Sequence, residues 1–164
     1  MKARKKEEQI SNYIMEHYEN LYRFAYSYMK NKEDAMDVVQ ESVYKALRSC
    51  QTLKDENQIA SWIYQIVIRT ALDMLRKSKR EIVGMEEYQE EGVKDKYEDI
   101  DVMKSLYTLS EEERTIVILR YFEDRKLKEI ATILSEPENT IKSKLYRALK
   151  KLKIELGTQE GYEA

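Results

Sequence analysis

Basic and polar side chains share one side of a helix that the apolar spacing predicts within residues 135–152. The other side is an apolar stripe made of Ile141, Leu145, Ala148 and Leu152. The polar side offers hydrogen-bond donors to phosphates and base edges, and such a helix fits a DNA major groove. Its members are Asn139, Ser143, Arg147 and Lys150, flanked by Lys142, Lys144, Tyr146 and Lys151. We interpret this helix as DNA-reading; the alternative is a solvated, lysine-rich surface helix.

The residues before this helix predict how it begins. Ser135 and Glu138 form a capping-box pattern, Ser-x-x-Glu, and Pro137 falls in the first turn, where its missing N–H costs nothing. Residues 127–134 have the spacing of a short amphipathic helix. Together the two segments predict a helix-turn-helix.

Residues suited to catalysis are scarce. His17 is the only histidine and Cys50 the only cysteine, which excludes an intrachain disulfide and a cysteine-based zinc site. The sequence shows no glycine-rich phosphate loop, no nucleophile beside a base and no metal-ligand spacing. We therefore predict that the protein is not an enzyme and has no catalytic residues, metal, cofactor or small-molecule substrate.

The sequence also lacks the signals of membrane insertion. No apolar run approaches the ~18–20 residues that a transmembrane helix needs. Residues 1–6 are basic, but no apolar segment of a signal peptide follows them. We expect these six residues to form a flexible arm and the protein to be cytoplasmic.

Composition and charge divide the chain into parts. With 37% charged residues, four Gly and one Pro, the composition is typical of an all-α protein. Residues 1–80 hold 15 Lys+Arg against 11 Asp+Glu, residues 81–101 hold 2 against 9, and residues 102–164 hold 12 against 11. The net charge of −2 therefore reflects an acidic middle block and does not exclude nucleic acid. We predict two helical domains, 1–80 and 102–156, joined by a flexible acidic linker, 81–101, and followed by a disordered tail, 157–164.

The first domain is predicted to begin with two helices. Helix 8–30 carries a bend near 17–20, and helix 32–49 is capped by Asn31. We expect the second helix to bury Met36, Val39, Val43, Ala46 and Leu47. Its other side presents Asp37, Glu41, Lys45 and Arg48, with Glu41 and Lys45 spaced as an ion pair. From charge alone, this side is a solvated surface.

A polar loop, 49–57, leads to a long apolar helix, 58–79, the predicted centre of the domain. One narrow polar stripe runs along this helix: Gln65, Arg69, Asp73, Arg76, Lys77 and Arg80. Cations at a helix C-terminus also interact favourably with the helix dipole. Stabilisation of the helix therefore explains the cationic end of the stripe as well as DNA binding does. In the second domain we predict a short helix at 102–109 and a helix from a Ser110–Glu113 capping box to about Asp124.

In order and spacing, several segments resemble the extracytoplasmic-function (ECF) family of RNA polymerase sigma factors. In the first half these segments are 32–43, 62–66 and 71–76, and in the second half 119–124, 129–131 and 140–148. The resemblance covers about 18–80 and 103–156, and within the family it is strongest to the sigma-V type, which is linked to cell-envelope stress. It implies a promoter-recognition subunit of RNA polymerase, with a sigma-2 domain before the linker and a sigma-4 domain after it.

The resemblance also implies which residues make contacts. Those implied to dock on the coiled coil of the polymerase beta-prime subunit are Asp37, Gln40 and Glu41. Those implied to bind the promoter minus-ten element, including a flipped base, are Asp55, Asn57, Trp62, Arg69, Asp73, Arg76, Lys77, Lys79 and Arg80. Those implied to bind the minus-thirty-five element are Asn139, Thr140, Lys142, Ser143, Lys144, Tyr146, Arg147 and Lys150. Further partners implied are the beta flap of polymerase and a membrane-bound anti-sigma factor.

The sequence departs from the family pattern at five positions. Arg69 stands where Asn is frequent, Ser135 and Asn139 where Gly is common, Glu136 where an apolar residue is usual, and Lys144 where Arg is usual. Two other classes remain open. One is a stand-alone helix-turn-helix regulator, which does not need the segment 62–66 or the acidic helix before it. The other is a helical adaptor that docks an acidic partner on its basic helix.

Overall fold

The computed structural model describes residues 2–82 and 104–160, and side chains within 4–79 and 104–153. Every regular element in these ranges is helical, as the composition predicts. The chain divides into two compact units, Met1–Gly92 and Val93–Ala164. Each unit is described separately below. Residues 83–103 of the predicted acidic linker lie outside the described ranges, so the linker and the domain boundaries stay predictions.

Within residues 2–82, the first unit contains four α-helices: α1 (Lys2–Glu16), α2 (Tyr18–Met29), α3 (Lys32–Arg48) and α4 (Ile59–Ile82). The predicted flexible arm at residues 1–6 is wrong from Lys2 onward, because α1 begins there. The buried residues Ile10 and Ile14 give α1 an apolar stripe that anchors it. The predicted bend lies at His17, where α1 ends and α2 begins.

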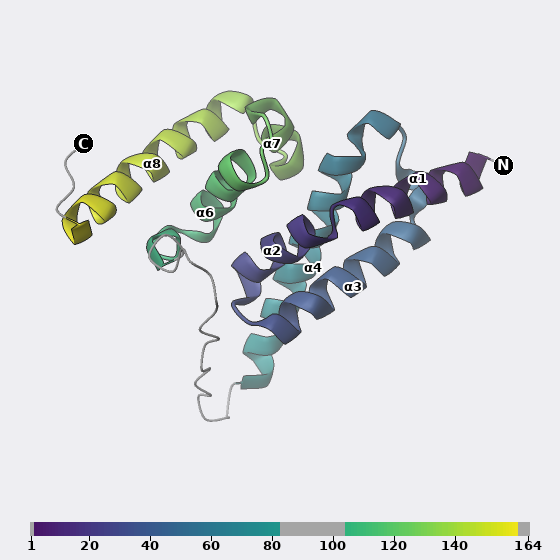
Figure 1. Ribbon diagram of the computed structural model, residues 1–164, viewed down its shortest axis with the longest axis horizontal. Helices are drawn as coiled ribbons and strands as arrows, with labels where there is room; N and C mark the ends of the chain where they lie inside the picture. Colours follow the sequence, from purple (N-terminus) through teal and green to yellow (C-terminus); the bar gives the residue numbers. More distant parts are fainter. Residues whose placement is uncertain (1, 83–103, 161–164) are drawn as a thin grey trace. The chain divides into compact units, whose positions relative to one another are not determined.

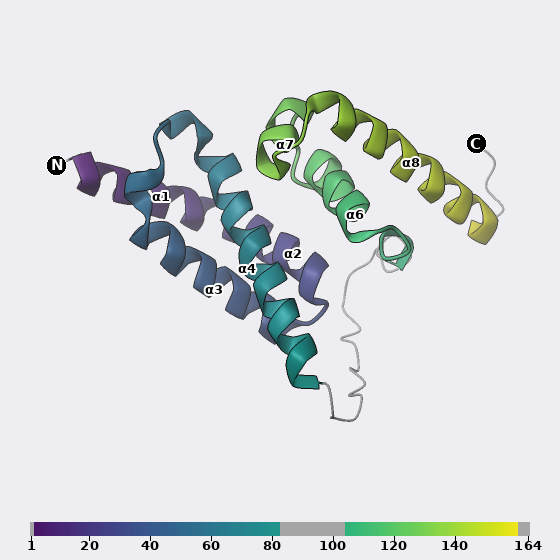
Figure 2. The same ribbon diagram turned by 180° about the vertical axis from the view of Figure 1, so that it is seen from behind.

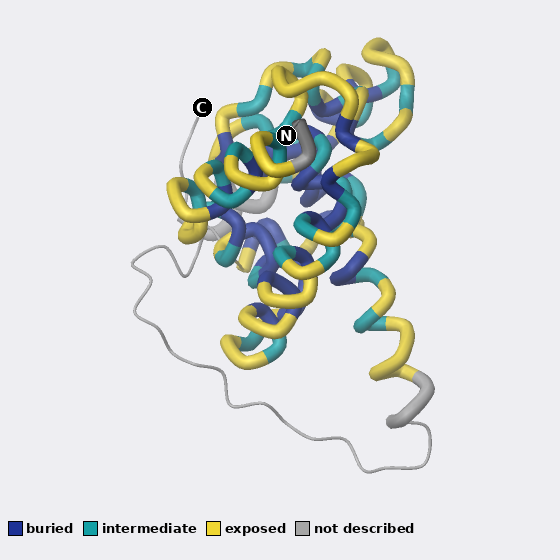
Figure 3. Tube along the Cα trace, turned by 90° about the vertical axis from the view of Figure 1, so that its right-hand side faces the viewer, coloured by how far each residue is buried: buried dark blue, intermediate teal, exposed yellow. Residues whose placement is uncertain are grey.

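The core of the first unit lies between α2, α3 and α4, which pack against one another (Figures 1 and 2). Phe24 of α2 meets Tyr64 of α4 edge to face, with ring centroids 5.1 Å apart. Leu21, Val38 and Val67 are also buried there. In Figure 3, buried stretches of the tube alternate with exposed ones along each helix, as amphipathic periodicity requires.

Helix α3 confirms the predicted cap and corrects the predicted buried face. The Asn31 side chain accepts a hydrogen bond from the N–H of Asp34 at 2.8 Å, a standard N-cap. Met36 is 42% exposed, while Ala35, Val38 and Ser42 are buried in its place. Val43 and Leu47 are half-buried, and Val39 and Ala46 are buried as predicted. Lys45 does not pair with Glu41; its Nζ donates to Thr70 Oγ1 at 3.1 Å.

The second unit contains α6 (Glu111–Val117), a π-helical turn (Ile118–Phe122), α7 (Leu127–Leu134) and α8 (Glu138–Glu160). The predicted capping box is confirmed: Glu113 N–H donates to Ser110 Oγ, and Ser110 N–H donates to a Glu113 carboxylate oxygen. Of the predicted helix at 102–109, residues 104–106 are helical and 107–109 are not, and residues 102–103 lie outside the described ranges. Helix α8 includes residues 157–160, which the sequence assigns to a tail, and 161–164 lie outside the described ranges.

Between α7 and α8, the predicted capping box of Ser135 and Glu138 is wrong. Ser135 has left-handed backbone angles, φ 55° and ψ 46°, and ends α7. Its N–H donates to Thr132, and the N–H of Glu136 donates back to Ala131 at 3.0 Å, the pattern of a Schellman turn. Ser135 therefore occupies the position where Gly is favoured, and no left-handed residue is needed at Asn139, which lies within α8.

Candidate nucleic-acid interfaces

Helix α8 presents the predicted basic face to solvent. Ile141, Leu145 and Ala148 are buried, as the apolar stripe predicts, and Leu152 is half-buried. On the other side, six of the eight residues predicted to contact the minus-thirty-five element are exposed: Asn139, Lys142, Ser143, Tyr146, Arg147 and Lys150. Tyr146 is 60% exposed, so its ring is available to stack or to contact a base edge. Thr140 is half-buried.

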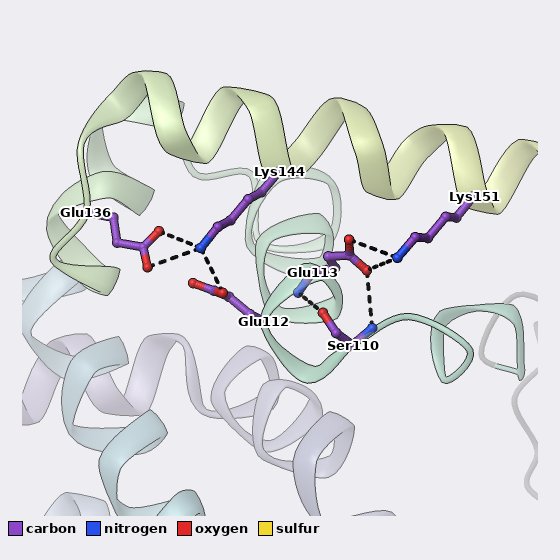
Figure 4. Close-up of polar contacts among 6 residues, drawn as sticks. All are labelled: Ser110, Glu112, Glu113, Glu136, Lys144 and Lys151. Atoms are coloured by element: carbon purple, nitrogen blue, oxygen red, sulfur yellow. Dashed lines mark hydrogen bonds and ion pairs between the residues drawn. The ribbon is translucent and has the colours of Figure 1, made fainter.

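Lys144 differs from these residues because its ammonium is held within the unit (Figure 4). Its Nζ donates to Glu112 Oε1 at 2.8 Å and to both carboxylate oxygens of Glu136, at 3.0 and 3.3 Å. The hydrogen bond from Lys144 lowers the pKa of Glu112, against an opposing effect of partial burial. The hydrogen bond to Glu112, followed by that to Glu136, raises the pKa of Lys144. Glu112 and Lys144 are therefore held in their charged forms.

Lys151 makes a second link between α8 and α6. Its Nζ lies 2.9 and 3.1 Å from the two carboxylate oxygens of Glu113, whose side chain is 8% exposed. Burial acts to raise the pKa of Glu113, but the hydrogen bonds from Lys151 and Ser110 outweigh it and lower this pKa. The sequence pattern did not predict the pairing of Glu112 with Lys144 or of Glu113 with Lys151, because these partners lie 32 and 38 residues away.

In the first unit, the predicted polar stripe of α4 is exposed at Arg69, Asp73, Arg76 and Lys77 and half-buried at Gln65, and Lys79 beside it is also exposed. Arg76 Nη2 donates to Asp73 Oδ1 at 2.6 Å, and both side chains are more than 60% exposed. Such an exposed pair contributes little to stability, so Arg76 can exchange Asp73 for a phosphate at small cost. The side chain of Arg80, also predicted to bind the minus-ten element, lies outside the described side chains.

The loop before α4 carries the other residues predicted to bind the minus-ten element. Asp55 caps a short 3-10 turn, Glu56–Gln58, by accepting the N–H of Asn57 at 2.9 Å. Asp55 and Asn57 are exposed, and Trp62 is half-buried one helical turn into α4. Fourteen residues separate Trp62 from Arg76, which corresponds to about 21 Å along a helix. The structure thus places the Trp62 ring near the start of α4, next to the loop that carries Asn57, and the cationic group near the end of the same helix.

The residues predicted to bind polymerase lie together on α3. Asp37, Gln40 and Glu41 are all exposed, and Met36 and Tyr44 beside them are 42% and 58% exposed. Arg48 lies 5.6 Å from the centre of the Tyr44 ring, a cation–π contact. Beside its carboxylates, this face therefore exposes Met and Tyr, two residue types that are enriched at protein interfaces. The sequence pattern did not predict this apolar surface, because it placed Met36 in the core and did not assign Tyr44 to either side of the helix.

Comparison with known proteins identifies both units. Residues 13–81 match the family model described as Sigma-70 region 2, and residues 100–152 match the model described as Sigma-70, region 4. Over 150 residues the chain is 46% identical to "RNA polymerase sigma factor SigV" of Bacillus subtilis (strain 168), covering 90% of each chain. It is 27% identical to the "ECF RNA polymerase sigma-E factor" of Haemophilus influenzae, covering 84% of this chain and 82% of that one. The chain belongs to the ECF family of RNA polymerase sigma factors.

The fold of this sigma factor agrees with that assignment. It resembles the sigma factor RpoE of Bartonella quintana, solved in complex with the anti-sigma factor NepR, with a TM-score of 0.74 at 24% identity. The match covers 89% of this chain and 95% of that chain. The resemblance inferred from sequence is therefore confirmed, as are the predicted all-α class and the two helical domains.

As a sigma factor, the protein is a transcription initiation factor that acts with RNA polymerase core and promoter DNA, and it is not an enzyme. Within 2–82 and 104–160, no helix is long and apolar enough to cross a bilayer. In the same described ranges, no group of three or more His, Cys, Asp or Glu side chains is arranged to hold a metal ion.

Proposed function

We propose that this sigma factor recognises its promoters through two separate surfaces, one on each unit. The surface on α8, with Lys142, Ser143, Tyr146 and Arg147 at its centre, reads the minus-thirty-five element in the major groove. The observation that carries this proposal is the exposure of these side chains directly opposite the buried stripe of α8. A buried stripe fixes which side of the helix faces outward, so the reading face is held in place.

The second surface, on the loop 49–58 and α4, binds the minus-ten element. Trp62 and the residues before it trap an unstacked base, and Arg69, Arg76, Lys77, Lys79 and Arg80 bind the neighbouring phosphates. Trapping a base outside the stack stabilises the opened strand, which is how this unit supports promoter melting. The spread of these residues along α4 supports the division into a base site and a phosphate site.

The α3 face of Asp37, Gln40 and Glu41 docks on the coiled coil of the beta-prime subunit, and the second unit binds the beta flap. Each DNA surface is small and binds promoter weakly by itself. Polymerase is needed to bring the two surfaces together, and joining two weak sites raises their overall affinity. The protein works in the cytoplasm. An anti-sigma factor, anchored in the membrane, holds it inactive until envelope stress releases it. The complex of the structural relative with an anti-sigma factor supports the inhibition, while the membrane anchor and the stress signal rest on the resemblance to the sigma-V type.

Fluorescence anisotropy of a labelled promoter fragment tests the proposal against its alternatives. We expect weak binding of the duplex by the sigma factor alone, and tight binding when core polymerase is added. Tight, sequence-specific binding by the protein alone would favour a stand-alone regulator. Core binding without any gain in promoter affinity would favour a helical adaptor.

A further inference from the structure

The cations of α8 fall into two groups that differ in what they contact. Lys144 and Lys151 point toward α6 and meet carboxylates there, as Figure 4 shows. Lys142, Arg147 and Lys150 are exposed and make no ion pair with any described residue. The basic character of the helix in the sequence therefore overstates the charge that is free to meet DNA.

The carboxylates that hold Lys144 come from two different elements. Glu112 lies in the first turn of α6, and Glu136 lies in the turn between α7 and α8. One ammonium thus connects α6, the turn and α8, and its side chain is only 22% exposed. To reach a phosphate, Lys144 would have to leave both carboxylates, a cost that the freely exposed Lys142 does not bear.

Lys151 gives the helix a second attachment. It follows Lys144 by seven residues, two turns of the same face, which corresponds to about 10.5 Å along the helix axis. Its partner Glu113 is itself fixed by the capping box with Ser110. The buried stripe of α8 already fixes which side of the helix faces outward, and two attachment points two turns apart restrict its tilt more than one point would.

We propose that Lys144 and Lys151 are positioning residues that clamp α8 onto α6, and that Lys144 is not a phosphate contact. This inference rests on the proposed reading of the minus-thirty-five element by α8. The clamp fixes the angle at which Lys142, Ser143, Tyr146 and Arg147 are presented. Glu136 stands where an apolar residue is usual in the family, and its carboxylate is part of the clamp because it accepts hydrogen bonds from Lys144.

The salt dependence of promoter binding by the full holoenzyme separates the two roles. Each phosphate contact contributes a slope of about −0.9 to the plot of log K against log salt. Lys142→Met and Lys150→Met should therefore each flatten the slope by about 0.9. Their matched variants, Lys144→Met and Lys151→Met, should leave it unchanged while lowering the preference for the native minus-thirty-five element over a scrambled one by about 3- to 10-fold. A slope flattened by about 0.9 in Lys144→Met would overturn the proposal.

The carboxylate partners provide a test in which every cation is retained. Glu112→Gln and Glu136→Gln, alone and combined, remove negative charge near DNA, so simple electrostatics predicts tighter binding with unchanged preference. The clamp predicts a loss of preference instead, and Lys144→Arg should preserve the preference. Tighter binding with full preference in the combined variant would contradict the clamp.

A measurement without DNA keeps the test independent of the proposed function. Hydrogen exchange of α8 amides in the free full-length protein should accelerate in Lys144→Met and in Glu112→Gln, and the double variant should show less than the sum of the two effects. Additive effects would mean that the two residues do not act together. If wild-type holoenzyme does not bind promoter but this coupling is present, the proposed function fails while the structural clamp stands.

Discussion

Lys151 donates to both carboxylate oxygens of Glu113, at 2.9 and 3.1 Å, across 38 residues of sequence. The same carboxylate accepts the N–H of Ser110 and so completes the cap at the start of α6. A single glutamate therefore both begins one helix of the sigma-4 unit and holds another. The stability of α6 and the placement of α8 are coupled through this residue.

The two serines in Ser-x-x-Glu patterns should respond oppositely to substitution. Ser110 caps α6, so Ser110→Ala should lower the free energy of unfolding of this unit by about 1 kcal/mol. Ser135 holds a left-handed conformation, so Ser135→Gly should raise that free energy by about 0.5 kcal/mol, since glycine adopts φ > 0 without steric cost. Hydrogen exchange of amides in α6 and α8 measures both effects. Similar destabilisation by the two substitutions would contradict the assigned roles.

The ion pair of Glu112 and Lys144 predicts how stability depends on pH. Because the pKa of Glu112 is lowered in the folded state, its contribution is complete above about pH 4.3, the ordinary pKa of Glu, and is lost as pH falls through the lowered value. Because the pKa of Lys144 is raised, its contribution is complete below about pH 10.4 and is lost as pH rises through the raised value. The pair therefore contributes fully at neutral pH.

Urea unfolding between pH 3 and pH 7 tests this dependence. Glu112→Gln should be less stable than the wild type at pH 7, and the difference should shrink as the pH falls toward 3. Glu111→Gln is a suitable control, since Glu111 lies in the same turn of α6 and makes no ion pair with a described residue. A difference between wild type and Glu112→Gln that stays constant down to pH 3 would argue against the pair.

Arg147→Ala should weaken recognition of the minus-thirty-five element. Arg147 is exposed at the centre of the reading face, and a well-placed base contact contributes about 1–3 kcal/mol of discrimination. We expect about tenfold weaker promoter binding by holoenzyme, together with a relaxed preference at one or two base pairs. Competition binding with single base-pair substitutions measures this. Preference unchanged at every position would remove Arg147 from the reading face.

Asp37→Lys should weaken binding to core polymerase without unfolding the protein. Asp37 is exposed beside Gln40 and Glu41, so reversal of its charge places a cation in an acidic interface. Glu16→Lys makes the same change of charge on α1, on another exposed residue, and should have little effect. Titration with core polymerase compares the two variants, and circular dichroism checks the fold. Equal affinities would exclude this face from the interface.

Apolar periodicity predicted most helices of this sigma factor, and its errors have physical causes. In α3 the predicted buried face was rotated by one residue at Met36, and each helical residue turns the face by about 100°. Val38 and Ala35 fill the core there, leaving Met36 available for a partner. At residues 1–6, the charge suggested a flexible arm, but the apolar residues Ile10 and Ile14 farther along α1 anchor a helix that begins at Lys2.

The candidate DNA-binding face of α8 shows which features local sequence can predict and which it cannot. The exposed residues of α8 follow from its own apolar stripe, so local sequence was sufficient to predict them. The role of Lys144 depends on Glu112, which lies 32 residues away, and no local pattern encodes that distance. Ser110 and Ser135 carry the same Ser-x-x-Glu pattern, yet Ser135 ends a helix because α7 precedes it directly. Tertiary context decided these cases.

Run-off transcription with purified core polymerase on fragments of the source genome tests whether this protein directs polymerase to promoters. We expect discrete transcripts that appear only when this sigma factor is added, disappear with Asp37→Lys and weaken with Arg147→Ala. A second sigma factor of known activity confirms that the core enzyme is competent. Failure of the folded wild-type protein to direct any transcript with that competent core, over the whole set of genomic fragments, would contradict the account.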